Sequence, residues 1–238
     1  MRHDTFSNHI AGEWTQGSGA TPNINPSDLN DTIGHYARAN ASQTSEAIEA
    51  AAAAFPKWRT SSPLVRFEAL DQIGSEILAR VDELGDLLAR EEGKTLSEAK
   101  AEVHRAGHLF KYFAAEAYRA TGDTYQSLRD GVSLKVLREP IGVVGVITPW
   151  NFPLAIPAWK IAPALAYGNT VVFKPAELVP GSAWLLSDII ARARLPEGVF
   201  NLVVGKGREV GEAIVTHPKV SGVTFTGSTP VGPCPSQG

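Results

Sequence analysis

The sequence predicts an α/β fold in which an N-terminal helical segment leads into a doubly wound parallel sheet. Helical periodicity between capping signals fills most of the first half of the chain. Four short apolar, β-branched runs begin near residues 142, 170, 199 and 221, and a helical stretch follows each of the first three. Strands and helices that alternate at intervals of about 22 to 29 residues are typical of βαβ units, whose helices cover both faces of the sheet.

Composition limits the class of protein. The 238 residues are 43% hydrophobic and 20% charged, so the chain can bury a core. The formal net charge of -3, without a long run of one sign, argues against a nucleic-acid or anionic-membrane partner. No stretch approaches the ~20 apolar residues of a membrane span, and the single cysteine, Cys234, cannot form an internal disulfide. We therefore expect a cytoplasmic protein.

The first half is predicted to contain edge strands followed by four helices. Residues 7–40 show short alternating runs between turn signals, as in edge strands or a hairpin. We expect a first helix with Glu46 in its first turn and Pro56 at its end. Ser62 and Pro63 predict the start of a second helix, whose apolar face would comprise Leu64, Phe67, Leu70, Ile73 and Ile77. A third helix is expected from Asp82 to Gly93 and a fourth from Leu96 to Ala120.

Two features near the middle of the chain are a histidine pair and a candidate hairpin. His104 and His108 lie four residues apart on the fourth helix, a spacing that can hold zinc. No third ligand is evident, so an ordinary helix face is favoured and no metal is assigned. Residues 123–140 carry Asp130-Gly131 between two alternating runs, which predicts a β-hairpin.

The residues that follow each strand of the predicted sheet are candidate site residues, because ligands bind beyond the carboxyl ends of parallel strands. Lys174 and Glu177 could hydrogen-bond ribose hydroxyls, although a solvated loop pair is an equally good interpretation. A phosphate could approach at Gly207, Gly211, Gly227 and Ser228. The GxGxxxG spacing follows the third strand, whereas a dinucleotide fingerprint is GxGxxG after the first, so this motif taken alone favours a plain tight turn.

Four motifs in this order, TPWNFP, FKPAE, GVFNLVVG and FTGS, resemble the N-terminal, cofactor-binding half of the aldehyde dehydrogenases. The resemblance runs from about residue 8 to residue 232. Within the family, the sequence is most similar to the α-ketoglutaric semialdehyde (2,5-dioxovalerate) dehydrogenases. It implies a Rossmann-like sheet of the aldehyde dehydrogenase type and the NAD(P)-dependent oxidation of an aldehyde, such as a semialdehyde, to a carboxylic acid. In that reaction a cysteine thiolate adds to the carbonyl, hydride passes to the nicotinamide, and a glutamate activates water.

The resemblance also implies roles for single residues. Asn151 would donate its side-chain amide to the oxygen that becomes negative when the thiolate attacks. Phe152 and Trp159 would line the aldehyde tunnel, with core packing as the other interpretation. Glu177 would accept from a free 2′-hydroxyl and repel a 2′-phosphate, so NAD is favoured and NADP is possible. The implied cofactor-binding residues are Ile147, Thr148, Pro149, Trp150, Lys174, Glu177, Gly207, Gly211, Phe225, Gly227 and Ser228.

The chain departs from the family pattern after residue 232. Relatives are about twice as long, and the segments that bear the nucleophile, the general base and the nicotinamide-ribose glutamate are absent. Cys234 has no matching flank and is not assigned as the nucleophile. We expect residues 1–122 and 141–232 to form the cofactor-binding domain, 123–140 an oligomerisation hairpin and 233–238 a divergent tail. The alternative to a truncated enzyme is an inactive dinucleotide-binding remnant; either is expected to lack activity alone and to self-associate.

Overall fold

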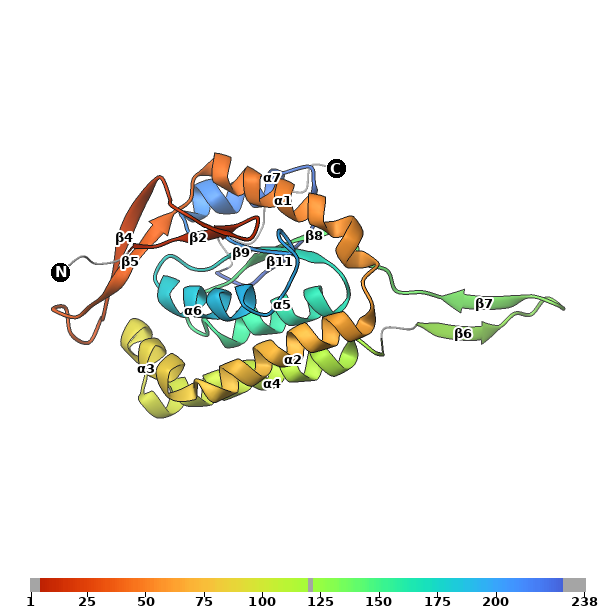
Figure 1. The fold of residues 1–238 in the computed structure, drawn as a ribbon, viewed down its shortest axis with the longest axis horizontal. Coiled ribbons are helices and arrows are strands. Elements are labelled where there is room, and N and C mark those ends of the chain that lie inside the picture. The colour runs from red at the N-terminus through yellow and green to blue at the C-terminus, as the bar shows by residue number, and fades with distance from the viewer. Residues whose placement is uncertain (1–4, 120–121, 229–238) are drawn as a thin grey trace.

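A six-stranded sheet lies at the centre of the computed structural model, which describes residues 5–119 and 122–228 (Figure 1). Its order is β11-β8-β9-β10-β2-β3. The strands β8 (Val143–Ile147), β9 (Thr170–Lys174), β10 (Phe200–Leu202) and β11 (Val220–Phe225) are parallel. Antiparallel β2 (Asn8–Ile10) and β3 (Glu13–Thr15) extend the β10 edge. The four apolar runs therefore form the predicted parallel sheet.

Helices cover both faces of this sheet, as the doubly wound prediction requires. Figure 1 shows α5 (Ala155–Ala166) and α6 (Pro180–Ala191) along one face, and α1 (Ala41–Arg59) and α7 (Glu212–Thr216) along the other. Every residue of β9 is buried, because this central strand has helices on both sides. The stretch after β10 begins as a π-helical turn, η1 (Gly207–Gly211), before α7.

The first helix, α1, differs from its prediction at both ends. Its N-cap is Asn40, whose side chain accepts from Gln43 N, so Glu46 lies beyond the first turn. Asparagine is one of the best N-caps, which explains the earlier start. Pro56 lies inside the helix rather than ending it. Trp58, 1% exposed, packs the following turn into the core, and this burial outweighs the hydrogen bond that proline cannot donate.

Helices α2 (Pro63–Ala79), α3 (Val81–Glu92) and α4 (Leu96–Glu116) form an outer layer beyond α5 and α6. Ser62 caps α2 as predicted, accepting from Leu64 N. Leu64 itself is 50% exposed, because at 3.6 residues per turn it lies about 120° around the helix from Leu70. Thr95 and Glu98 form a capping box on α4, and that helix ends at Glu116, earlier than expected.

Two smaller sheets complete the described residues. The strands β1 (Thr5–Phe6), β4 (Gly19–Ile24) and β5 (Thr32–Arg38) form one, which confirms edge strands in this region. The strands β6 (Asp123–Gln126) and β7 (Ser133–Val136) pair as the predicted hairpin, with Gly131 at φ 72°, and Figure 1 shows it projecting from the body. None of the helices in the described part of the chain is long and apolar enough to cross a membrane.

Candidate active site and cofactor site

The predicted site residues from three strand ends lie side by side. Ile147, the last residue of β8, pairs with Lys174 of β9 on one side and with Phe225 of β11 on the other. From β8 the chain proceeds to β9 and β10 in one direction and then returns to β11 in the other. This reversal is a topological switch point, where open α/β sheets bind their ligands.

The loop after β8 presents Asn151 to solvent. Thr148 N donates to Lys174 O at 3.3 Å, which continues the strand pairing into the loop, and Pro149 is half-buried. The hydroxyl of buried Thr148 has no hydrogen-bond partner in the described chain. Trp150 is 53% exposed, and the Asn151 side-chain amide bonds to no other described residue. Among the residues that the structure describes, the polar side-chain groups of Thr148 and Asn151 therefore have no hydrogen-bond partner.

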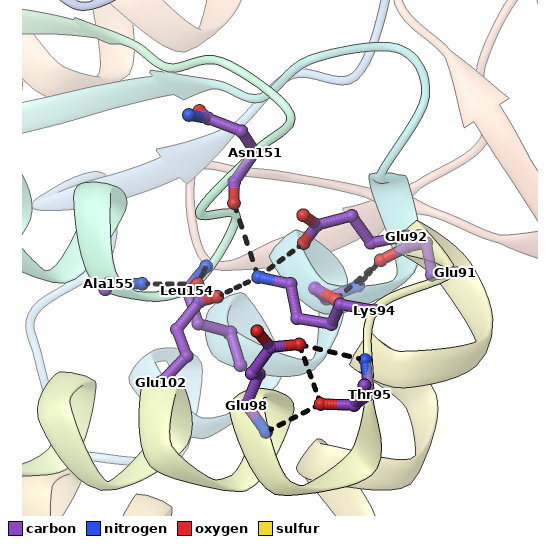
Figure 2. Close-up of polar contacts among 10 residues, drawn as sticks. Glu91, Glu92, Lys94, Thr95, Glu98, Glu102, Asn151, Leu154 and Ala155 are labelled. Atoms are coloured by element: carbon purple, nitrogen blue, oxygen red, sulfur yellow. Dashed lines mark hydrogen bonds and ion pairs between the residues drawn. The ribbon is translucent and has the colours of Figure 1, made fainter.

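An ion-pair network from the α3–α4 region contacts the main chain of this loop (Figure 2). Lys94 Nζ donates to Glu102 Oε2 at 2.6 Å and to the Asn151 carbonyl at 3.3 Å, and it pairs with Glu92 Oε2 at 2.8 Å. Glu102 Oε1 accepts from Leu154 N at 2.9 Å and Ala155 N at 3.0 Å. Glu102 thus satisfies the free N–H groups at the start of α5. Figure 2 shows the Asn151 amide pointing away from the network.

A second buried carboxylate caps α6. Glu91 Oε1 accepts from Gly181 N at 2.5 Å, and Oε2 accepts from Ser182 N at 2.8 Å and Ser182 Oγ at 2.5 Å. Asn23 Nδ2 also donates to Oε1. Burial raises the pKa of Glu91 to about 7, against the lowering effect of these donors. The N-termini of both α5 and α6 are therefore occupied by protein carboxylates, which leaves neither free for a phosphate.

The sequence analysis missed Glu91, Lys94 and Glu102. A signal was present, since both glutamates fall on the apolar faces of their helices: Glu91 continues the buried series Leu84 and Leu88. A charged residue is rarely buried unless it is paired, so a glutamate in such a position indicates a partner.

Lys174 and Glu177, the predicted ribose residues, both contact main-chain atoms. Lys174 is 5% exposed, and its Nζ donates to Pro175 O at 2.7 Å. Burial lowers the pKa of Lys174, and nearby Glu177 opposes that effect. Glu177 is exposed, and its Oε1 accepts from Gly207 N at 2.9 Å, which joins the end of β9 to η1. Lys174 is therefore buried, whereas Glu177 stays in contact with solvent.

The predicted glycines differ in their surroundings. A Cβ on Gly207 would meet nothing within 4 Å, and one on Gly211 would meet only Lys174 Cδ at 3.9 Å. Packing does not require glycine at either position, so both leave open space beside Lys174 and Glu177. A Cβ on Gly227, by contrast, would lie 2.5 Å from the Phe225 ring. Packing alone explains Gly227, and Ser228 next to it is exposed.

Phe152 and Trp159 border a hollow of about 270 Å³ rather than the core, being 45% and 56% exposed. The other lining residues are Arg105, Ala155, Ile156, Lys160 and Thr226. Lys160 Nζ donates to Thr224 Oγ1 at 2.7 Å, and burial lowers its pKa. The core-packing interpretation of the two aromatics therefore does not hold in the described chain.

His104 and His108 lie on the exposed side of α4 with ring centroids 6.5 Å apart. Among the residues that the structure describes, no group of three or more His, Cys, Asp or Glu side chains could hold a metal ion. Cys234 and the tail 233–238 lie outside the described residues.

Comparison with known proteins decides the family. A model of the aldehyde dehydrogenase family matches residues 14–234. The chain belongs to the aldehyde dehydrogenase family. Among curated relatives, the 2,5-dioxopentanoate dehydrogenase of Saccharolobus solfataricus is 42% identical over 224 residues, which is 94% of this chain and 47% of the relative. The α-ketoglutaric semialdehyde dehydrogenase of Bacillus subtilis is 42% identical over 231 residues, 96% of this chain and 47% of the relative.

Solved aldehyde dehydrogenases share the fold described above. The NAD-dependent enzyme from Sinorhizobium meliloti superimposes with a TM-score of 0.92 at 33% identity, covering 97% of this chain and 46% of that structure. Betaine aldehyde dehydrogenase from Staphylococcus aureus, solved in complex with NAD+, has a TM-score of 0.89 at 33% identity, covering 93% and 46%. This aldehyde dehydrogenase chain therefore spans about half the length of the curated relatives it matches.

Proposed function

We propose that this chain forms the NAD-binding half of an enzyme that oxidises an aldehyde to a carboxylic acid, with a semialdehyde as its substrate. One observation carries the proposal: a single loop connects the two halves of the candidate site. It leaves β8 beside Lys174, presents the unpaired Asn151 amide, and then places Phe152 on the hollow. An amide between a cofactor region and an apolar hollow is suited to meet a carbonyl oxygen there.

The residues present fit a dinucleotide. Lys174 is a buried cation with a single main-chain acceptor, so its remaining ammonium protons lack partners in the described chain, which is costly unless a ligand supplies oxygen atoms. Glu177 keeps its second carboxylate oxygen for a ribose hydroxyl, and that negative charge favours NAD over a cofactor with a 2′-phosphate. Gly207 and Gly211 leave space beside both side chains.

When bound, NAD supplies the acceptor for the hydride that leaves the aldehyde carbon. Within this chain, Asn151 Nδ2 would donate to the carbonyl oxygen as that oxygen becomes negative. A preorganised donor of this kind contributes about 2.7–4 kcal/mol, or roughly 10²–10³ in rate. The exposed apolar rings of Phe152 and Trp159 would exclude water from the aldehyde. Arg105 and Lys160 at the same hollow would attract the carboxylate at the far end of a semialdehyde.

Assembly and location belong to the same proposal. The β6–β7 hairpin is exposed along both strands, with Tyr125, Leu134 and Val136 each about half exposed. Unpaired strand edges with apolar side chains pair readily with another chain, so we propose a homo-oligomer in which this hairpin is covered. A cytoplasmic location stays a prediction from the sequence.

The test is aldehyde-dependent formation of reduced cofactor by the complete protein that contains this sequence, assayed with semialdehydes and neutral aldehydes. Asn151→Ala should lower kcat by about 10²–10³ while leaving NAD binding unchanged. Residues 1–238 alone are expected to be inactive, with no effect of Cys234→Ser. An Asn151→Ala enzyme with unchanged kcat would show that the loop does not serve this reaction.

A further inference from the structure

We propose that Lys94 is a positioning residue, which acts through the main chain of Asn151 to aim the oxyanion-stabilising amide. This inference rests on the proposed aldehyde oxidation. Lys94 lies in the short connection between α3 and α4, next to Gly93 in the left-handed conformation at φ 78°. From this position its ammonium group reaches across to the loop after β8, as Figure 2 shows.

The contacts of Lys94 restrain the loop on both sides of the amide. Lys94 Nζ donates to the Asn151 carbonyl at 3.3 Å and lies 4.7 Å from the centroid of the Phe152 ring. Its partner Glu102 holds the following Leu154 and Ala155 N–H groups. The pairing of Thr148 N with Lys174 O fixes the start of the loop. The main chain of the loop is thus restrained at its start, middle and end, while the Asn151 side chain points away from these contacts (Figure 2).

Charge and burial stabilise the ion pair of Lys94 with Glu102, which holds the ammonium group beside the loop. The side chains of Lys94 and Glu102 are 12% and 1% exposed, so solvent screens the pair little. Burial alone would lower the pKa of Lys94, but its contacts with Glu102 and Glu92 outweigh that effect and the pKa is raised. The lysine therefore stays charged at neutral pH. Removing it would leave the Glu92 and Glu102 carboxylates without their shared cation and would remove the donor to the Asn151 carbonyl.

An alternative is that Lys94 merely stabilises the fold. The two roles predict different combined effects on kcat when Lys94 and Asn151 are both substituted. If Lys94 acts through the amide, its loss matters only while the amide is present. If it stabilises the fold in general, its loss lowers activity equally with or without the amide. A double-mutant cycle measures this difference directly.

The experiment measures kcat and KM of the complete protein for Lys94→Met, Asn151→Ala and the double variant. Lys94→Met should lower kcat by about 10- to 100-fold, the scale of a misplacement of roughly 1 Å. In the Asn151→Ala background the same change should lower kcat less than about twofold. Lys94→Arg, which keeps a charged donor, should restore most of the lost activity. Lys100→Met is the matched control, because Lys100 forms an equally short 2.6 Å ion pair with Asp82 away from the loop.

Hydrogen exchange on residues 1–238 gives a readout that does not need turnover. Lys94→Met should speed exchange of the Leu154 and Ala155 amides, whereas Lys100→Met should not. Equal loss of kcat in both backgrounds, or unchanged exchange at these amides, would overturn the positioning role. If the unaltered protein oxidises no aldehyde, the proposed function is wrong and so is the positioning role in catalysis. Faster amide exchange in Lys94→Met would then show only that Lys94 anchors the loop. If Lys94→Met does not fold, Glu102→Gln replaces it in the cycle with the same expectations.

Discussion

Glu91 is predicted to make the stability of this chain depend on pH. Its pKa is raised to about 7 in the folded chain, mainly by burial, from an ordinary value of 4.5. A group with a raised pKa stabilises the fold fully below its unfolded pKa, and this stabilisation is lost as the pH rises through the folded pKa. At 1.36 kcal/mol for each unit of pKa shift, the contribution of Glu91 to the free energy of unfolding amounts to about 3 kcal/mol. About 2.5 kcal/mol of it is lost between pH 5 and pH 8.

The assay is denaturant unfolding of the unaltered chain and of Glu91→Gln at pH 5, 6, 7 and 8. Glutamine does not ionise, so the free energy of unfolding of the unaltered chain should fall by about 2.5 kcal/mol relative to the variant across this range. Glutamine also places an N–H group near the donors of Gly181, Ser182 and Asn23, so the variant is expected to be less stable at pH 5.

Two serines of α6 provide a matched pair of controls. Ser182→Ala removes a donor that lowers the pKa of Glu91, so the pH dependence should shift to higher pH. Ser187→Ala removes a buried hydroxyl on the same helix that donates to Ala183 O and, within the described chain, does not contact Glu91, so the pH dependence should stay as it was. A stability difference between the unaltered chain and Glu91→Gln that stays constant from pH 5 to pH 8 would refute the reasoning.

Three further predictions concern ligands and assembly. Glu177→Gln should weaken NAD and AMP binding alike by about 5- to 10-fold in calorimetry, because it weakens a charged acceptor at the adenosine ribose; NAD binding far tighter than AMP binding would contradict an adenosine-dominated site. Arg105→Leu should raise KM about 10-fold for a carboxylate-bearing semialdehyde and leave a neutral aldehyde unaffected; equal changes for both substrates would rule out recognition of the carboxylate. Leu134→Lys should reduce the self-association of residues 1–238 in light scattering, whereas a concentration-independent monomer before the change would contradict the exposed-edge argument.

The sheet could be predicted because its signals are local. A run such as TVVFK is apolar on both faces, and only a strand covered on both sides satisfies that pattern. The ends of these strands then had to meet at one sheet edge, which brought Ile147, Lys174 and Phe225 together. Ser62 before Pro63 was a helix start for an equally local reason.

The support of the site could not be predicted because its partners are remote in sequence. Glu102 bonds to Leu154, 52 residues away, and Glu91 bonds to Ser182, 91 residues away. Helical periodicity marks Glu102 as buried but does not say which N–H groups it meets. The predicted end of the first helix at Pro56 was wrong for a related reason. Trp58 is buried by residues from other parts of the fold, and this burial overrode the local helix-ending signal of the proline.

The two carboxylate caps on α5 and α6 turn the segment from Glu91 to Glu102 into a spacer of fixed length. Glu91 on α3 must reach the N-terminus of α6, while Glu102 on α4 must reach the N-terminus of α5. A residue inserted or deleted within α4 before Glu102 would turn Glu102 by about 100° around the helix axis and withdraw its carboxylate from the start of α5. Most surface connections tolerate length changes, but the connection at Gly93 and Lys94 should not, because its length decides which N–H groups the two carboxylates reach.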